Sequence, residues 1–234
     1  MNFNYDIIII GSGPGGEGAA MKATRNGQSV AIIENDEIGG GCNKWGTIPS
    51  KSLRQLSREV WHHRKQFDLQ EMLQKSDIII AKQTEIKKQR FAENEIDVFY
   101  GFASFINKNT IKISRENGSN EIITAKAFIL SPGSRPYHPD DIDFNDPKIL
   151  DSDKLLLLSD KSIKSITIYG AGVIGCEYAS ILGTLNIQIN LVNTRDKLMS
   201  FLDDEIIKVS QEKKTLRKEN ETLKMKLVSL EEFK

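Results

Sequence analysis

A chain of 234 residues is long enough for one or two domains, and its 32 basic and 32 acidic residues exclude strong electrostatic attraction to nucleic acid or anionic membranes. Two cysteines cannot form the disulfide framework of a small secreted protein. No apolar run approaches the roughly 20 residues that span a bilayer, and the N-terminus lacks a signal-peptide pattern. We expect a soluble, cytoplasmic protein without nucleic-acid or membrane partners.

The chain begins with the pattern of a dinucleotide-binding βαβ unit. Residues 5–10 form a continuous apolar run, which predicts a buried strand. A Gly-Ser-Gly-Pro-Gly-Gly turn follows at residues 11–16, and small residues predict a helix over 17–25. A second strand, residues 29–33, ends at Glu34. This order of strand, glycine turn, helix and strand is the context in which such a turn binds a dinucleotide.

Each glycine of this turn has a separate expected role. Gly11 forms the tight turn, Gly13 lets the backbone approach a pyrophosphate, and Gly16 lets the helix pack closely on the strand. The helix N-terminus offers unpaired N–H groups to the phosphates. Glu34 is suited to hydrogen-bond two ribose hydroxyls and would repel a 2′-phosphate. The site therefore predicts an ADP-containing dinucleotide.

Two amphipathic helices and three short alternating strands are expected next, near residues 51–67, 77–94, 96–100, 110–114 and 122–130. A link rich in Pro, Gly and Asp then occupies residues 131–153 and is the best candidate for a domain boundary.

The dinucleotide pattern occurs a second time after this link. A strand over residues 165–169 leads into Gly170-Ala-Gly172-Val-Ile-Gly175, a helix that continues to Leu182, and a strand over 187–192. Two turns in this context make a purely structural origin improbable. The second unit ends at Asn193, which carries no charge, and Arg195 follows. This pair can accept a 2′-phosphate without excluding a plain ribose, although Arg195 could also be an ordinary surface arginine.

The segment between these units carries a third motif, Gly39-Gly-Gly-Cys42-Asn-Lys-Trp45-Gly-Thr47-Ile-Pro-Ser50-Lys51. The layout of a first glycine fingerprint, this motif and a second fingerprint resembles the pyridine nucleotide-disulfide oxidoreductase family. In that family two cysteines five positions apart form a redox disulfide. Here Thr47 stands where the second cysteine would be, so Cys42 cannot form that disulfide. Disulfide reduction is therefore disfavoured.

Longer stretches narrow the resemblance to the transhydrogenases of this family, and they run from about Tyr5 to about Glu205. They read GSGPGGEGAAMKA, GGGCNKWGTIPSKSLR, GSRPYHP, YGAGVIGCEYASILG and LVNTRDKLMSFLD. The resemblance implies an FAD-dependent enzyme that transfers hydride between NADPH and NAD without a thiol relay, and it implies no metal site.

The resemblance also assigns site residues. The expected FAD contacts are Gly11, Gly13, Gly16, Glu34, Gly41, Cys42, Lys51 and the backbone near Ala103 and Gly133. The expected contacts to the nicotinamide dinucleotide are Gly170, Gly172, Gly175, Glu177, Asn193 and Arg195. Lys51 would place a cation near the reactive flavin nitrogen, and Cys42 would lie unpaired in the same environment. One departure is Ser131-Pro132 before Gly133, where the family has a small pair such as Ala-Thr.

We therefore expect an α/β fold in three parts. These are an incomplete Rossmann-type FAD-binding domain over residues 1–150, the start of a second Rossmann NAD(P)-binding domain over 151–205, and a helical tail over 206–234. Family members continue with a Gly-Asp segment that holds the flavin and a C-terminal dimerisation domain. No Gly-Asp dipeptide occurs here, and the C-terminal half of the family is expected to be missing.

Apolar residues in the tail recur at three- and four-residue steps, typical of a coiled coil. The series comprises Ile206, Val209, Lys213, Leu216, Asn220, Leu223, Leu227 and Leu230. It predicts a parallel homodimer, and the alternative is a single amphipathic helix or a chance pattern.

Three hypotheses for the function follow. Thr47 and Asn193 favour an FAD-dependent transhydrogenase, and Thr47 opposes an FAD-dependent disulfide reductase. The missing half and the altered tail favour a non-catalytic remnant that binds flavin or dimerises.

Overall fold

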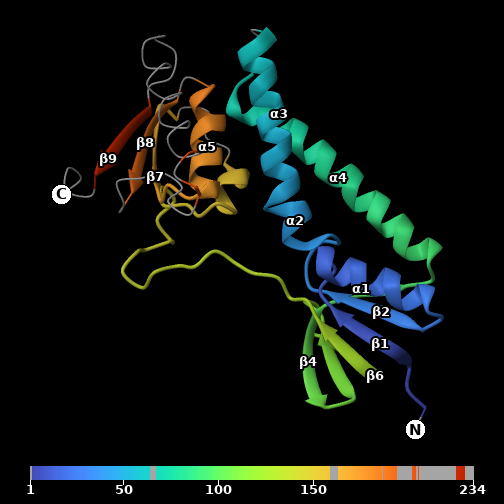
Figure 1. The fold of residues 1–234 in the computed structure, drawn as a ribbon. Coiled ribbons are helices and arrows are strands. Elements are labelled where there is room, and N and C mark those ends of the chain that lie inside the picture. The colour runs from blue at the N-terminus through green and yellow to red at the C-terminus, as the bar shows by residue number, and fades with distance from the viewer. Residues whose placement is uncertain are drawn as a thin grey trace. The chain divides into compact units, whose positions relative to one another are not determined.

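The structure is a computed structural model that describes residues 2–63, 67–158, 163–185, 187–193, 202–203, 205 and 225–229. The chain divides into two compact units, of which the first comprises Met1–Pro49 and Asp77–Asp153 and the second comprises Ser50–Ser76 and Lys154–Lys234 (Figure 1). We expected residues 1–150 to form one domain, whereas the structure groups Ser50–Ser76 with the second unit. The reason is that apolar side chains of this segment are buried in the core of that unit.

The first unit is built on a six-stranded sheet with strand order β3-β2-β1-β6-β5-β4. The strands are β1 (Tyr5–Ile10), β2 (Val30–Glu34), β3 (Asp97–Tyr100), β4 (Phe102–Asn107), β5 (Thr110–Ser114) and β6 (Asn120–Leu130). β1 pairs in parallel with β2 and β6, and β2 pairs in parallel with β3. β4, β5 and β6 form an antiparallel meander. The mixed sheet thus joins a parallel dinucleotide-type half to a meander.

The two faces of this sheet are buried against different partners, because successive residues of a strand point to opposite faces. Ile9 packs with Ala20 of α1 (Pro14–Arg25) and with Phe91 of α4 (Leu69–Glu93). Ile8 packs instead with Ile111 and other residues of the meander. Figure 1 shows α1 lying across one face of the sheet. Because both faces of the sheet are covered, a binding site is expected at the carboxyl ends of the parallel strands β1, β2 and β6.

Two elements of the first unit were not predicted. Helix α2 (Gly40–Lys44) begins in a run of glycines, which indicates a turn rather than a helix. Strand β4 begins directly after Gly101, which has a φ of 146°, and it pairs with β5 rather than with β3. Only one glycine separates β3 from β4, which is a weak signal of a boundary between two strands, and so β4 was missed.

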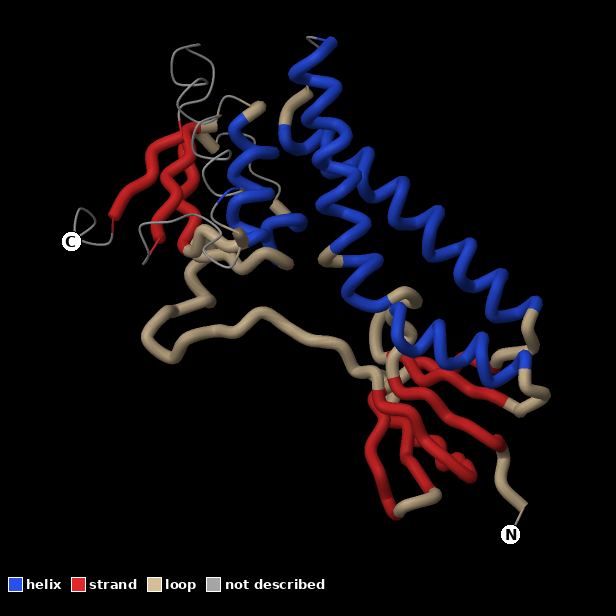
Figure 2. Tube along the Cα trace, viewed as in Figure 1, coloured by secondary structure: helices blue, strands red, loops and turns tan. Residues whose placement is uncertain are grey.

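The second unit contains a parallel sheet of three strands in the order β7-β8-β9. Its elements are β7 (Ser165–Tyr169), α5 (Val173–Gly183), β8 (Gln188–Asn193), β9 (Met225–Ser229) and a short 3₁₀ helix, η1 (Lys154–Leu157). Figure 2 shows these strands beside helical segments of the same unit. Helix α3 (Thr47–His63) and the start of α4 belong here from Ser50 to Ser76.

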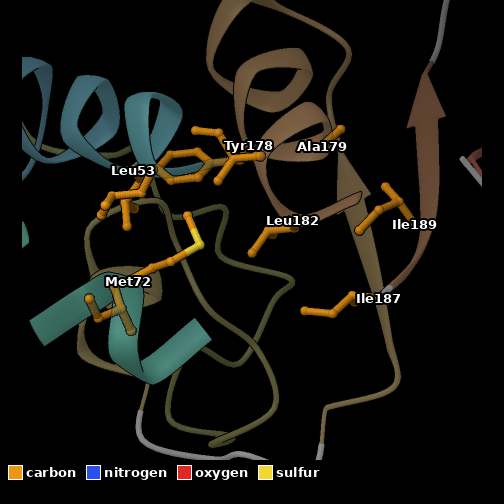
Figure 3. Close-up of a cluster of buried hydrophobic side chains, with 10 residues drawn as sticks. Leu53, Met72, Tyr178, Ala179, Leu182, Ile187 and Ile189 are labelled. Atoms are coloured by element: carbon orange, nitrogen blue, oxygen red, sulfur yellow. The ribbon is translucent and has the colours of Figure 1, made fainter. Parts of the chain in front are cut away.

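The core of the second unit explains this grouping. Leu53 of α3 and Met72 of α4 are buried in one cluster with Tyr178 and Leu182 of α5 and with Ile189 of β8 (Figure 3). Helix α5 opens on a glycine turn and is apolar over much of its surface, so it buries residues on more than one side. Residues 50–76 provide the second covering layer that one βαβ unit lacks.

The prediction of a helical tail is wrong for residues 225–229. They form β9, which pairs in parallel with β8 from Ile189↔Met225 to Asn193↔Ser229. A strand here satisfies the backbone groups along the edge of β8, which a helix could not do. The predicted coiled-coil helix over residues 206–230 therefore cannot include Leu227, which lies in β9. The rest of the predicted tail, residues 206–224 and 230–234, lies outside the described residues.

Within the described ranges, no helix is long and apolar enough to cross a membrane.

Candidate functional site

The first glycine turn has the geometry that its motif requires. Gly11 has a φ of 100°, and a Cβ at this position would lie 2.2 Å from the carbonyl oxygen of Ser131. A Cβ on Gly16 would lie 1.9 Å from the carbonyl oxygen of Gly11. Gly13, at the N-cap of α1, meets no described atom within 4 Å of such a Cβ. Gly11 and Gly16 are therefore required by packing, whereas Gly13 leaves open space at the helix N-terminus.

Glu34 lies beside this turn at the carboxyl end of β2 and is only 5% exposed. Its Oε2 accepts hydrogen bonds from the backbone N–H of Ser12 at 2.9 Å and from the Ser12 hydroxyl at 2.6 Å. Its Oε1 accepts from the backbone N–H of Asp36 at 3.1 Å. Ser12 was not predicted as a site residue, although a hydroxyl residue between Gly11 and Gly13 could have indicated a hydrogen-bonding role in the turn.

The glycine-rich turn before Cys42 packs on the first turn. Gly39 and Gly40 have φ values of 105° and 56°, and a Cβ on Gly40 would lie 3.0 Å from the Cα of Gly13. A Cβ on Gly41 would meet no atom of the described chain within 4 Å, and Cys42 is half-buried. The turns that contain Gly13 and Gly41 thus lie together, and each leaves space for a ligand.

Asn43 anchors this turn from inside the protein. Its side chain is 1% exposed, and its Nδ2 donates to the hydroxyl of Thr84 on α4 at 2.7 Å. Its Oδ1 has no hydrogen-bond partner among the described residues. Asn43 was not singled out from the sequence, because a short polar residue in a glycine-rich segment reads as exposed.

Gly133 and Ala103 are the remaining expected FAD contacts in this unit. Gly133 has a φ of 77° and is exposed, and Ala103 lies half-buried on β4 opposite Ile113. The departure at Ser131-Pro132 is accommodated locally. Ser131 donates from its N–H to the carbonyl of Ile10 at 2.9 Å, and its hydroxyl donates to the same oxygen at 3.1 Å. The link therefore begins tied to the end of β1, without a donor from Pro132.

A partly buried charge cluster lies at the start of α1. Glu17 is paired with Lys87 and with Arg90, whose Nη1 lies 2.7 Å from Oε1. Burial by itself would raise the pKa of Glu17, but the hydrogen bonds and charges of Lys87 and Arg90 lower it below its ordinary value. The carboxylate of Glu17, which lies next to the first glycine turn, is thereby paired with two cations of α4.

The second glycine turn repeats the first. Gly170 has a φ of 108°, Gly172 caps α5, and a Cβ on Gly175 would lie 1.9 Å from the carbonyl oxygen of Gly170. The N–H of Gly170 donates to Val192 at 2.9 Å, just as the N–H of Gly11 donates to Ile33 at 2.8 Å. Asn193 ends β8 as expected, and Arg195 lies outside the described residues.

The second unit also contains an ion pair between two expected site residues. Lys51 Nζ lies 2.5 Å from Glu177 Oε1, and their side chains are 52% and 16% exposed. Glu177 was expected to contact the nicotinamide dinucleotide, and its carboxylate here accepts a hydrogen bond from Lys51. The pairing was not predicted, because the two residues are separated by 126 positions.

The cysteine, histidine and acidic side chains of the described residues were also compared with the expected site. Cys42 and Cys176 are not joined in a disulfide, and Thr47 occupies the position five residues after Cys42. No group of three or more His, Cys, Asp or Glu side chains that could hold a metal is present in the part of the chain that the structure describes.

Comparison with known proteins agrees with this geometry. The profile of the pyridine nucleotide-disulphide oxidoreductase family matches residues 5–225, which include both glycine turns. The chain belongs to this family. A solved structure with a similar fold is that of the HOCl-induced flavoprotein disulfide reductase RclA from Escherichia coli. That protein is 23% identical with a TM-score of 0.82, and the match covers 96% of this chain and 49% of the other.

Several family members of known sequence are more similar. The soluble pyridine nucleotide transhydrogenase of Azotobacter vinelandii is 44% identical over 216 residues, 87% of this chain and 46% of that protein. The protein of the same name from Colwellia psychrerythraea is 46% identical over 217 residues, 88% of this chain and 46% of that protein. The chain thus spans about half the length of these relatives.

Proposed function

We propose that the first unit binds FAD, that the second binds a nicotinamide dinucleotide, and that the chain belongs to a system that transfers hydride between NADPH and NAD. The observation that carries the proposal is the repeated glycine turn. In both copies, a Cβ added to the third glycine of the motif would lie 1.9 Å from the carbonyl oxygen of the first glycine. Two equivalent turns supply two dinucleotide sites, and the relatives at 44–46% identity are named transhydrogenases.

The residues of the first unit fit FAD. Glu34 offers a buried carboxylate of the kind that binds ribose hydroxyls, and the N-terminus of α1 at Gly13 offers N–H groups and space for a pyrophosphate. Gly41 and Gly133 leave room for close approach of the backbone. A carboxylate at Glu34 disfavours a 2′-phosphate, and so we assign NADP binding to the second unit, where Asn193 is uncharged.

Bound FAD supplies a ring system that accepts a hydride and gives it up again. Two features of this chain bear on the chemistry at that ring: a positive charge on Lys51, and the absence of a second cysteine five positions after Cys42. By the family resemblance, the ammonium group of Lys51 would lie near the flavin and would favour its anionic reduced form. Within the second unit this group donates a hydrogen bond to Glu177. Thr47 leaves Cys42 without the second thiol that would carry electrons to a disulfide. We therefore propose nucleotide-to-nucleotide transfer, with disulfide reduction as the disfavoured alternative.

The dimer predicted from the tail is not part of this proposal, because Met225–Ser229 forms strand β9. The predicted coiled coil would require these residues to be helical.

The proposal is tested by adding FAD to the purified chain, removing unbound flavin, and recording the visible flavin spectrum. NADPH is then added without oxygen, followed by either a thio-analogue of NAD or a small disulfide as acceptor. We expect bound flavin that is bleached by NADPH and reoxidised by the NAD analogue. Flavin that stays bound but is never bleached supports a flavin-binding protein without turnover. Reoxidation by the disulfide alone would overturn the assignment.

A further inference from the structure

Ser12 joins three segments that meet at the first dinucleotide turn. It lies between Gly11 and Gly13 and is fully buried. Its N–H and its hydroxyl both donate to Glu34 Oε2, at 2.9 and 2.6 Å. Its hydroxyl oxygen also accepts the backbone N–H of Gly39 at 2.9 Å. One small side chain therefore links the fingerprint turn, the end of β2 and the start of the Cys42 turn.

The direction of each hydrogen bond is determined. A peptide N–H can only donate, so the Ser12 oxygen must be the acceptor from Gly39. An ionised carboxylate can only accept, so the Ser12 hydroxyl proton points to Glu34. The hydroxyl proton is therefore used by Glu34, and Gly39 occupies one of the two acceptor positions of the oxygen.

This network restricts what Glu34 can offer. A carboxylate has about four acceptor positions, and Ser12 fills two of them with its N–H and O–H while Asp36 fills a third with its N–H. The carboxylate is thus oriented by protein donors before any ligand arrives, which lowers the cost of ordering it on binding. About one acceptor position remains, and a ribose hydroxyl bound there would meet a carboxylate whose orientation Ser12 sets.

We propose that Ser12 is a positioning residue for the adenosine ribose: it aims Glu34 at the ribose hydroxyls and ties that carboxylate to the Gly39–Cys42 turn. The inference rests on the proposed binding of FAD to this unit. It predicts that loss of the Ser12 hydroxyl weakens binding through the ribose hydroxyls specifically, since Glu34 is the group that it orients.

The experiment compares Ser12→Ala with Thr24→Val as the matched control. Thr24 lies in α1, shortly after the Ser12 turn, and among the described residues its hydroxyl donates to the carbonyls of Ala20 and Met21 in its own helix. Dissociation constants are measured by fluorescence titration for FAD and for an FAD analogue whose adenosine lacks both ribose hydroxyls. The thermal midpoint of each protein without ligand is recorded separately.

We expect Ser12→Ala to bind FAD at least tenfold more weakly than the parent chain and to bind the analogue within about threefold of it. Thr24→Val should change neither constant more than about twofold. An equal loss for FAD and the analogue would show that Ser12 only packs the turn and would overturn the proposal. So would unchanged binding of both ligands. If Ser12→Ala does not fold, Ser12→Cys, which keeps the size but donates weakly, takes its place with the same expected ratio.

Failure of the underlying function gives a different result. If the folded parent chain binds neither FAD nor the analogue, the FAD assignment itself is wrong, and the role of Ser12 falls with it. If the parent chain binds both equally, FAD is bound but Glu34 does not read the ribose, and only the inference about Ser12 and Glu34 is overturned.

Discussion

The ammonium nitrogen of Lys51 lies 2.5 Å from a carboxylate oxygen of Glu177, across 126 positions of the chain. Lys51 belongs to α3 and Glu177 to the first turns of α5, and both helices lie in the second unit. Lys51, the last residue of the Cys42 motif, and Glu177, two residues after the second glycine turn, are therefore brought together within the second unit.

This pair should matter more for hydride transfer than for stability. Lys51 is 52% exposed, and an exposed ion pair contributes only about 0–1 kcal/mol to folding. Lys51→Met should therefore lower the free energy of unfolding, measured in urea, by about 1 kcal/mol or less. The rate of flavin reduction by NADPH should fall at least about tenfold, which corresponds to 1.4 kcal/mol of barrier. Lys44→Met, which breaks the surface pair with Asp36, serves as the control and should leave that rate unchanged.

The glycines of the two turns should respond differently to alanine. Gly16→Ala and Gly175→Ala each place a methyl group 1.9 Å from a carbonyl oxygen, which the fold must relieve by moving backbone. We expect a loss of about 3 kcal/mol in unfolding free energy for each, at the upper end of the cost of overpacking. Gly13→Ala meets no described atom within 4 Å, so it should unfold normally but bind FAD more weakly. Weak FAD binding by Gly13→Ala together with a loss of stability would contradict this separation.

Cys42 should be dispensable for electron transfer between nucleotides. The residue five positions later is Thr47, so no second thiol is available at the position from which the family's disulfide is formed. Cys42→Ser should then leave the rate of NADPH-dependent flavin reduction within about twofold of the parent, a difference of less than 0.5 kcal/mol in the barrier. Stopped-flow absorbance measures this rate directly. Loss of reduction with FAD still bound would require a thiol mechanism.

Glu17 should make the stability of the first unit depend on pH. Lys87 and Arg90 hold the pKa of Glu17 below its ordinary value against the opposing effect of burial. The folded chain therefore binds a proton at Glu17 less readily than the unfolded chain. The stabilisation is present above the ordinary carboxyl pKa of about 4.3 and is lost as the pH falls through the lower folded value. Urea unfolding between pH 7 and 3 should show a smaller acid-dependent loss for Glu17→Gln than for the parent. Identical losses would refute the assignment.

The buried pair of Asn43 and Thr84 should show strong non-additivity. Thr84→Val removes the 2.7 Å acceptor of a buried amide and should cost about 1–3 kcal/mol. Asn43→Leu together with Thr84→Val removes both polar groups, including the unpartnered Oδ1, and should be close to the parent in stability. A double-mutant cycle from chemical denaturation measures the coupling. Additive losses would show that the hydrogen bond does not carry the interaction.

Local patterns in the sequence were sufficient for the glycine turns and for several strands. The strands at residues 5–10, 110–114 and 165–169 were predicted with the bounds that the structure has. The same holds for the separate roles of Gly11 and Gly16, whose close contacts the structure confirms. These features depend on side-chain periodicity and on backbone conformations that only glycine adopts, both of which are encoded within a few residues.

Contacts between distant segments needed the tertiary structure. Ser12 bonds to Glu34 across 22 positions and to Gly39 across 27, and Lys51 reaches Glu177 across 126. No local pattern records such pairs, because they depend on how the helices and strands pack. Strand β9 shows the same limit most clearly. The spacing of Leu216, Leu223 and Leu230 favoured a helix on local periodicity. Residues 225–229 instead pair in parallel with the open edge of β8, and this pairing with a distant strand satisfies backbone groups of β8 that local periodicity cannot indicate.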